Sequence, residues 1–278
     1  MEYLVAIGCT DKYAHAMINA ARKGHLNCIK WLLEHTYQYH PQGSADRVVV
    51  EAAKLGYLNI LEFFHAPRYA LEEMSDKRRR IEDAGAWWKR SRDAMDEAAA
   101  HGHLDVVKWL YANRSEGCTT AAMDGAARNG HLEMLVWLDK ITNEGCTKKA
   151  MQQAAMKGHL EVVKWLATSR KEGCSVEVVE YAIISDNLRV ASFLQKNFPQ
   201  YAPDKSDLWI WPQNIFDTLL FIQANYPDVF TLDFGRHTRV SLTSDCSKGS
   251  DLLTLKWLEE HYAGRPSKKK KEVFFWTL

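Results

Sequence analysis

Three Gly-His pairs recur in this chain at steps of 28 residues, and two other columns keep the same step. The pairs are Gly102-His103, Gly130-His131 and Gly158-His159, and the two columns are Trp109, Trp137, Trp165 and Cys118, Cys146, Cys174. A repeat at a fixed period constrains the architecture more than any other sequence signal. A unit of this length cannot bury its own apolar face, so it must stack on copies of itself as a solenoid.

The sequence pattern of each unit predicts two helices joined by the Gly-His turn. Small hydroxyl residues precede the first helix, where they can accept hydrogen bonds from the free N–H groups of a helix start; they are Ser91, Thr119, Thr147 and Ser175. Glycines follow the second helix, and we expect them to end it in a left-handed conformation; they are Gly117, Gly145 and Gly173. The unit is therefore helix–turn–helix–loop, and the chain is predicted to be all α.

The register extends in both directions. Gly24-His25 and Gly56-Tyr57 mark earlier copies, and Asn187-Leu188, Phe216 and Leu252 mark later ones. We count about eight units over residues 1–263. The widest gap between turns, from Gly56 to Gly102, predicts an insertion at about 67–92, and residues 264–278 form a basic C-terminal tail.

The turn region carries a resemblance to a known family. Residues 126–132, Ala-Ala-Arg-Asn-Gly-His-Leu, followed by Val136-Trp137-Leu138, resemble the core of the ankyrin repeat. The resemblance implies an ankyrin-like α-solenoid whose first helices line a concave side. The period is shorter than the usual ~33 residues. We therefore expect short loops such as 116–118 in place of the hairpin fingers of that family.

Comparison of the copies within the chain separates core positions from variable ones. One stripe of the first helix hardly changes: Ala94, Met95, Ala98, Ala99; Ala122, Met123, Ala126, Ala127; and Ala150, Met151, Ala154, Ala155. That spacing forms one apolar face of a helix. The second helix repeats Leu104, Val106, Val107, Trp109 and Leu110. Both sets are predicted to be core.

The opposite stripe of the first helix varies, so we predict that packing leaves it free for recognition. Its apolar members, such as Ile18 and Val50, are poor choices for a surface that only keeps the protein soluble. Random drift of a solvated face is the competing explanation. The predicted partner-binding residues on this stripe are Arg22, Val50, Lys54, Asp96, Asp124, Arg128, Gln152, Met156, Glu180, Tyr181 and Ile184. On this hypothesis Asp124→Ala changes stability by less than about 0.5 kcal/mol, and Arg128, Met156, Tyr181 and Ile184 form a hot spot.

The insertion carries Trp87 and Trp88, which cannot both face one helical core. Two interpretations stay open: one tryptophan braces the widened junction, or the pair forms a partner-binding knob. We include both among the candidate binding residues. Two basic pairs, at 77–78 and 89–90, resemble a bipartite nuclear import signal, and residues 266–271 resemble a monopartite one.

Composition excludes several classes of function. The net charge of +1 favours binding neither to nucleic acid nor to a membrane surface. Cysteines in one column of a stack lie about 10 Å apart, beyond the ~7 Å limit for a disulfide, which indicates free thiols in a reducing compartment. The chain has no long apolar run and no secretory signal, so we expect an intracellular, cytoplasmic protein, with nuclear import left open.

No motif for catalysis is present, so we predict no enzyme, no cofactor and no metal site. His103 belongs to the turn column and is read as structural. The predicted function is a non-catalytic scaffold or adaptor, monomeric, that binds another protein on the concave face. Fold-level analogy suggests a microbial or viral effector acting on host proteins. Two alternatives stay open: a nuclear protein that contacts nucleic acid through the basic insert and tail, and a substrate-receptor fragment of a ubiquitin-ligase adaptor.

Overall fold

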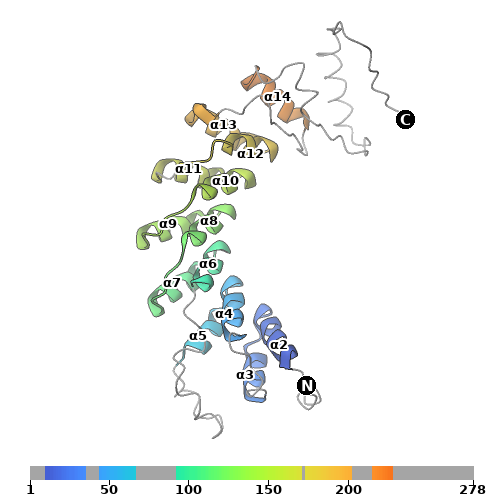
Figure 1. Ribbon diagram of the computed structural model, residues 1–278, viewed down its shortest axis with the longest axis vertical. Helices are drawn as coiled ribbons and strands as arrows, with labels where there is room; N and C mark the ends of the chain where they lie inside the picture. Colours follow the sequence, from blue (N-terminus) through green and yellow to red (C-terminus); the bar gives the residue numbers. More distant parts are fainter. Residues whose placement is uncertain (1–9, 36–43, 67–91, 171–172, 202–214, 228–278) are drawn as a thin grey trace, which may run out of the picture. The chain divides into compact units, whose positions relative to one another are not determined.

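The computed structural model describes residues 10–35, 44–66, 92–170, 173–201 and 215–227. Within these ranges the chain forms thirteen α-helices and one short 3-10 helix, with no strand (Figure 1). The prediction of an all-α solenoid is confirmed. The chain divides into two compact units, residues 1–175 and residues 176–278.

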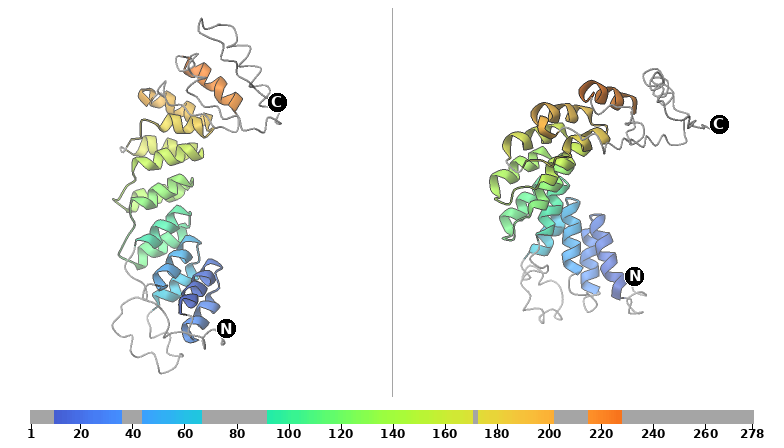
Figure 2. Two further views of the ribbon diagram at one scale, coloured as in Figure 1. Left: turned by 45° about the vertical axis from the view of Figure 1, so that its right-hand side comes forward. Right: turned by 45° about the horizontal axis from the view of Figure 1, so that its top comes forward.

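The first unit contains five helix pairs. Their bounds are α2 Thr10–Arg22 and α3 Leu26–His35, α4 Ser44–Lys54 and α5 Leu58–His65, α6 Asp93–Ala100 and α7 Leu104–Asn113, α8 Thr120–Arg128 and α9 Leu132–Ile141, and α10 Lys148–Lys157 and α11 Leu160–Ser169. The first helices of the pairs pack side by side in chain order, and each also packs on its own second helix. Figure 2 shows the resulting two layers, one of first helices and one of second helices.

The core of this unit is the predicted alanine and methionine stripe, and every one of its twelve members is buried. Small side chains bring neighbouring first helices close together. At Gly125, for example, an added Cβ would lie 2.5 Å from the Cβ of Ala100. On the second helices the prediction holds for Val106, Val107 and Leu110 but is wrong for Leu104 and Trp109, which are only half-buried.

The starts of the first helices follow the predicted capping pattern in two repeats. The Thr119 hydroxyl accepts a hydrogen bond from the Ala121 N–H, and the Thr147 hydroxyl accepts one from the Lys149 N–H, each at 3.1 Å. The same prediction is wrong for Ser175, because α12 begins two residues later, after Glu177. Ser91 lies outside the described residues.

The loop glycines are left-handed, as predicted, but they do not end the second helices. Gly117 has a φ of +70°, whereas α7 already ends at Asn113 and is followed by an extended Arg114. The glycine turns the chain inside the loop instead. Residues 116–118 contain no strand, which confirms the expectation of a loop without a hairpin finger.

The insertion does not interrupt the stack. Helices α4 and α6 pack directly on each other, although α5 ends at His65 and α6 begins at Asp93. Most of the inserted segment, with Trp87 and Trp88, and the tail at 264–278 lie outside the described residues, as do the basic segments that resemble import signals.

The second unit contains α12 Val178–Ile184, α13 Leu188–Asn197, the 3-10 helix η4 Pro199–Tyr201 and α14 Ile215–Asn225. Helix α14 begins and ends close to 28 residues after α13, so it is the second helix of a seventh copy. Asp186 takes the position of the turn glycine and keeps a positive φ of 60°. It accepts a hydrogen bond from the buried Thr218 hydroxyl at 3.1 Å. The eighth copy, around Leu252, lies outside the described residues.

Candidate partner-binding surface on the first helices

Two of the predicted binding residues fasten one repeat to the next. The Asp96 carboxylate accepts hydrogen bonds from the Thr119 backbone N–H at 2.8 Å and from its hydroxyl at 2.6 Å. Asp124 makes the same two bonds with Thr147, at the same distances. Burial raises the pKa of the Asp96 carboxyl, while the hydrogen bonds from Thr119 lower it.

The position of these aspartates is therefore a seam between repeats. Ile18, at the equivalent position of α2, is only 3% exposed, and Val50 and Gln152 are half-buried. The hypothesis that packing leaves this column free is wrong for Asp96, Asp124 and Ile18. A side chain there points along the stack toward the start of the next first helix, so its neighbours decide its identity.

The Gly-His pairs form a second seam. Each turn glycine packs against the ring that follows the glycine of the next repeat: an added Cβ at Gly102 would lie 2.6 Å from the His131 ring, and one at Gly130 would lie 2.6 Å from the His159 ring. Tyr57 takes the ring position against Gly24. Burial, followed by the neighbouring histidines, lowers the pKa of His131. The ring column is structural, as predicted, and it acts between repeats rather than within one turn.

Exposed residues lie near the N-terminal ends of the first helices, for example Arg47, Asp93 and Lys149, and also at their C-terminal ends. The surface at the C-terminal ends contains several of the predicted binding residues. We call it the C-terminal ridge, and its members in the first unit are Arg22, Lys23, Lys54, Leu55, Ala100, His101, Arg128, Asn129, Met156 and Lys157. None of these residues is buried. The ridge contains four of the predicted binding residues: Arg22, Lys54, Arg128 and Met156.

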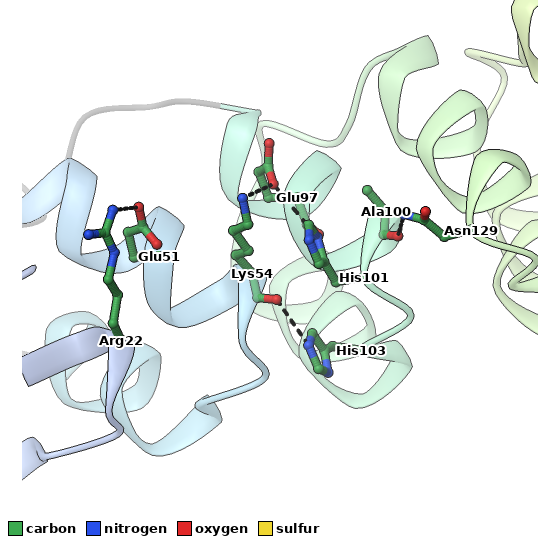
Figure 3. Close-up of polar contacts among 8 residues, drawn as sticks. All are labelled: Arg22, Glu51, Lys54, Glu97, Ala100, His101, His103 and Asn129. Carbon is green, nitrogen blue, oxygen red and sulfur yellow. Dashed lines mark hydrogen bonds and ion pairs between the residues drawn. The ribbon is translucent and has the colours of Figure 1, made fainter. Parts of the chain in front are cut away.

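Polar contacts cross the ridge from one repeat to the next over α2, α4 and α6 (Figure 3). Arg22 pairs with Glu51 at 2.8 Å, and this hydrogen bond is the main cause that lowers the pKa of Glu51. Lys54 lies 3.6 Å from the Glu97 carboxylate, which also lies 3.7 Å from His101. Carboxylates of the next repeat therefore neutralise Arg22 and Lys54 in this part of the ridge.

Two further contacts close the C-terminal ends of first helices. His103 Nε2 donates to the Lys54 carbonyl at 3.0 Å, and the Asn129 amide donates to the Ala100 carbonyl at 2.7 Å. Both donors belong to the repeat that follows. Each satisfies a helix-end carbonyl that has no partner within its own helix.

Among the described residues, the cations of the ridge on α8 and α10 are not paired as Arg22 and Lys54 are. Arg128 and Lys157 are exposed, and neither has a carboxylate partner within the part of the chain that the structure describes. Met156, which precedes Lys157 on α10, keeps 38% of its surface exposed. The sequence prediction identified Arg128 and Met156 but did not predict the ion pairs of Glu51, Glu97 and His101, because these depend on which side chains the stack places together.

The remaining candidates lie elsewhere. Glu180, Tyr181 and Ile184 are half-buried on α12 of the second unit.

Comparison with known proteins agrees with this architecture. The family model described as ankyrin repeats, in three copies, matches residues 95–180. Residues 95–180 are therefore ankyrin repeats. The crystal structure of the human ASB11 ankyrin repeat domain is similar at 17% sequence identity and a TM-score of 0.42, covering 73% of this chain and 96% of that one. No curated protein matches the sequence.

Within the part of the chain that the structure describes, no helix is long and apolar enough to cross a membrane. The same residues contain no group of three or more metal-binding side chains.

Proposed function

We propose that this ankyrin-repeat protein is a non-catalytic scaffold that binds a partner protein through the C-terminal ridge of its first unit. Ankyrin repeats generally mediate protein–protein interaction. The observation that carries the proposal is the division of the first helices into seam positions, which contact the next repeat, and ridge positions, which face outward and differ from repeat to repeat.

The proposed contact residues are Arg22, Lys54, Arg128 and Met156. Asp96 and Asp124 are no longer included, since both carboxylates are occupied by the next repeat. Glu180, Tyr181 and Ile184 are proposed as a contact of the second unit, and Trp87 and Trp88 as a contact of the insertion. A cytoplasmic location, nuclear import and a monomeric state belong to the same proposal.

The mechanism is pre-organisation. The seam bonds fix each first helix against the next, so the ridge residues keep their relative positions before a partner arrives. A partner that binds such a surface loses less conformational entropy than one that must order a loop. The short loops without hairpin fingers leave the first helices as the main variable surface of the first unit.

The test is capture of a partner by two matched triple variants. One carries Arg22→Ala, Arg128→Ala and Met156→Ala on the ridge, and the other carries Lys108→Ala, Tyr111→Ala and Lys140→Ala on the second helices. All six residues are exposed. We expect the ridge variant to weaken capture tenfold or more, about 1.4 kcal/mol, at an unchanged melting temperature. Equal capture by both variants, or a loss confined to the second-helix variant, would contradict the proposal.

A further inference from the structure

The charge on the ridge is uneven. Over α2, α4 and α6 two carboxylates face cations of the ridge, Glu51 for Arg22 and Glu97 for Lys54, and among the described residues only the ridge cation Lys23 lacks such a partner there. Over α8 and α10 the cations Arg128 and Lys157 have no such partner among the described residues. The equivalent positions to Glu51 and Glu97 are Gly125 and Gln153, which carry no charge.

Nearby acidic groups do not neutralise this pair. Asp124, one turn before Arg128, directs both carboxylate oxygens to Thr147. Glu161, four residues after Lys157, pairs with Lys164 at 2.8 Å. The positive charge of Arg128 and Lys157 is therefore left for solvent or for a ligand.

A cation at the end of a helix has a simpler role, because it interacts favourably with the helix dipole. That role does not require a cation here, since Ala100 occupies the position of Arg128 in the preceding repeat and Met156 occupies it in the following one. The dipole also does not account for an exposed methionine beside two cations.

We propose that the ridge over α8 and α10, formed by Arg128, Met156 and Lys157, binds an extended acidic segment of a partner protein. Stacked helices lie about 10 Å apart, and an extended chain in the polyproline II conformation advances about 3.1 Å per residue and presents every third side chain on the same face. Carboxylates three residues apart in the partner therefore match cations on adjacent first helices. An aliphatic side chain between them covers Met156. This inference rests on the proposed function and names the chemistry of the partner.

Protein is favoured over nucleic acid as the source of the negative charge. The chain has a net charge of only +1, and the uncompensated cations occupy two helices rather than a long track. Phosphate backbones bind through many such contacts. A protein segment with carboxylates beside an aliphatic side chain matches two cations beside a methionine more closely than a phosphate backbone does.

The probe is a fluorescein-labelled peptide that carries glutamate at every third position with leucine between, measured by fluorescence anisotropy with the full chain. Arg128→Glu with Lys157→Glu is the test variant. Lys108→Glu with Lys140→Glu on the second helices is the control, because it makes the same change in net charge at exposed positions. We expect the test variant to weaken peptide binding at least tenfold and the control variant to change it less than twofold.

Further measurements test whether the peptide binds through its negative charge. Replacing the glutamates of the peptide by glutamine should abolish binding, and raising the salt concentration should weaken it. Equal losses in both protein variants, or tighter binding of an oligothymidine of equal length, would overturn the inference. If the alanine ridge variant loses its partner while the charge-reversed variant and added salt leave capture unchanged, the proposed function stands and the acidic segment does not.

Discussion

The carboxylate of Asp96 accepts two hydrogen bonds from Thr119, the residue that caps the first helix of the next repeat. The Thr119 hydroxyl in turn accepts from the Ala121 N–H. One side chain therefore supports the start of its neighbour's helix as well as the contact between the two repeats. Asp124 and Thr147 repeat the arrangement one step further along.

Replacing Asp124 by alanine is expected to destabilise the protein by about 1–3 kcal/mol, because hydrogen bonds to a charged group are among the stronger ones and both are lost. This corrects the expectation from sequence that the change is almost neutral. Urea denaturation followed by circular dichroism measures the loss. Glu62→Ala, which removes an exposed carboxylate from the middle of α5, is the control and should cost less than about 0.5 kcal/mol. Equal midpoints for the two variants would show that the Thr147 contacts contribute nothing.

The junction after Gln152 offers the reverse experiment. Gln152 and Ser175 stand where Asp124 and Thr147 stand one repeat earlier, and the Ser175 hydroxyl oxygen is buried without a hydrogen-bond partner in the described structure. Gln152→Asp combined with Ser175→Thr recreates the Asp–Thr pair. We expect a gain of about 0.5–1.5 kcal/mol in the free energy of unfolding. A loss of stability in the double variant would mean that the later start of α12, after Glu177, prevents the two introduced side chains from pairing.

The glycine seam is tested by two alanine substitutions that share one backbone cost. Gly102 and Gly117 have φ values of +80° and +70°, so alanine is strained at both by about 1–2 kcal/mol. Only at Gly102 does the added Cβ meet a ring, that of His131, since nothing lies within 4 Å at Gly117. Gly102→Ala should therefore cost about 1–3 kcal/mol more than Gly117→Ala, measured from urea midpoints. Similar costs would show that the His131 ring moves aside freely.

Stability should fall as the pH drops below about 6.5. The pKa of His131 is lowered in the folded state, so in the window below the ordinary histidine value the unfolded chain binds more protons and unfolding becomes easier. His131→Tyr, which places the residue found at the equivalent position 57 in the ring column, removes this titration. Melting temperatures at pH 7.5 and pH 5.5 should differ less in the variant than in the parent chain. An unchanged difference would assign the pH dependence to other groups.

The buried cysteines should react slowly with alkylating reagents. Burial raises the pKa of Cys118 and of Cys174 to about 11, while Cys28 is exposed. The thiolate is the reactive form, and a raised pKa lowers the fraction of thiolate at pH 8. Iodoacetamide labelling of the native protein at pH 8, followed by peptide mass spectrometry, should modify Cys28 first. Labelling of all three at one rate would indicate that the stack opens readily.

The sequence by itself determined the repeat, its helices and its core. The 28-residue period, the constant alanine and methionine stripe and the capping threonines are local properties, set by helix geometry and by the need of each unit to bury one apolar face. Variation between copies also identified Arg128 and Met156 as outward-facing positions. These predictions required no knowledge of how closely the repeats approach one another.

Tertiary structure alone decided which variable positions are free. Asp124 and Arg128 lie one helical turn apart and vary in the same way between copies, yet only Asp124 reaches the next repeat. The difference arises because stacking brings the start of one first helix beside the middle of the previous one. It leaves the C-terminal ends in solvent. Pairing such as Lys54 with Glu97 has the same origin, since 43 residues separate the partners along the chain and only packing of α4 on α6 joins them.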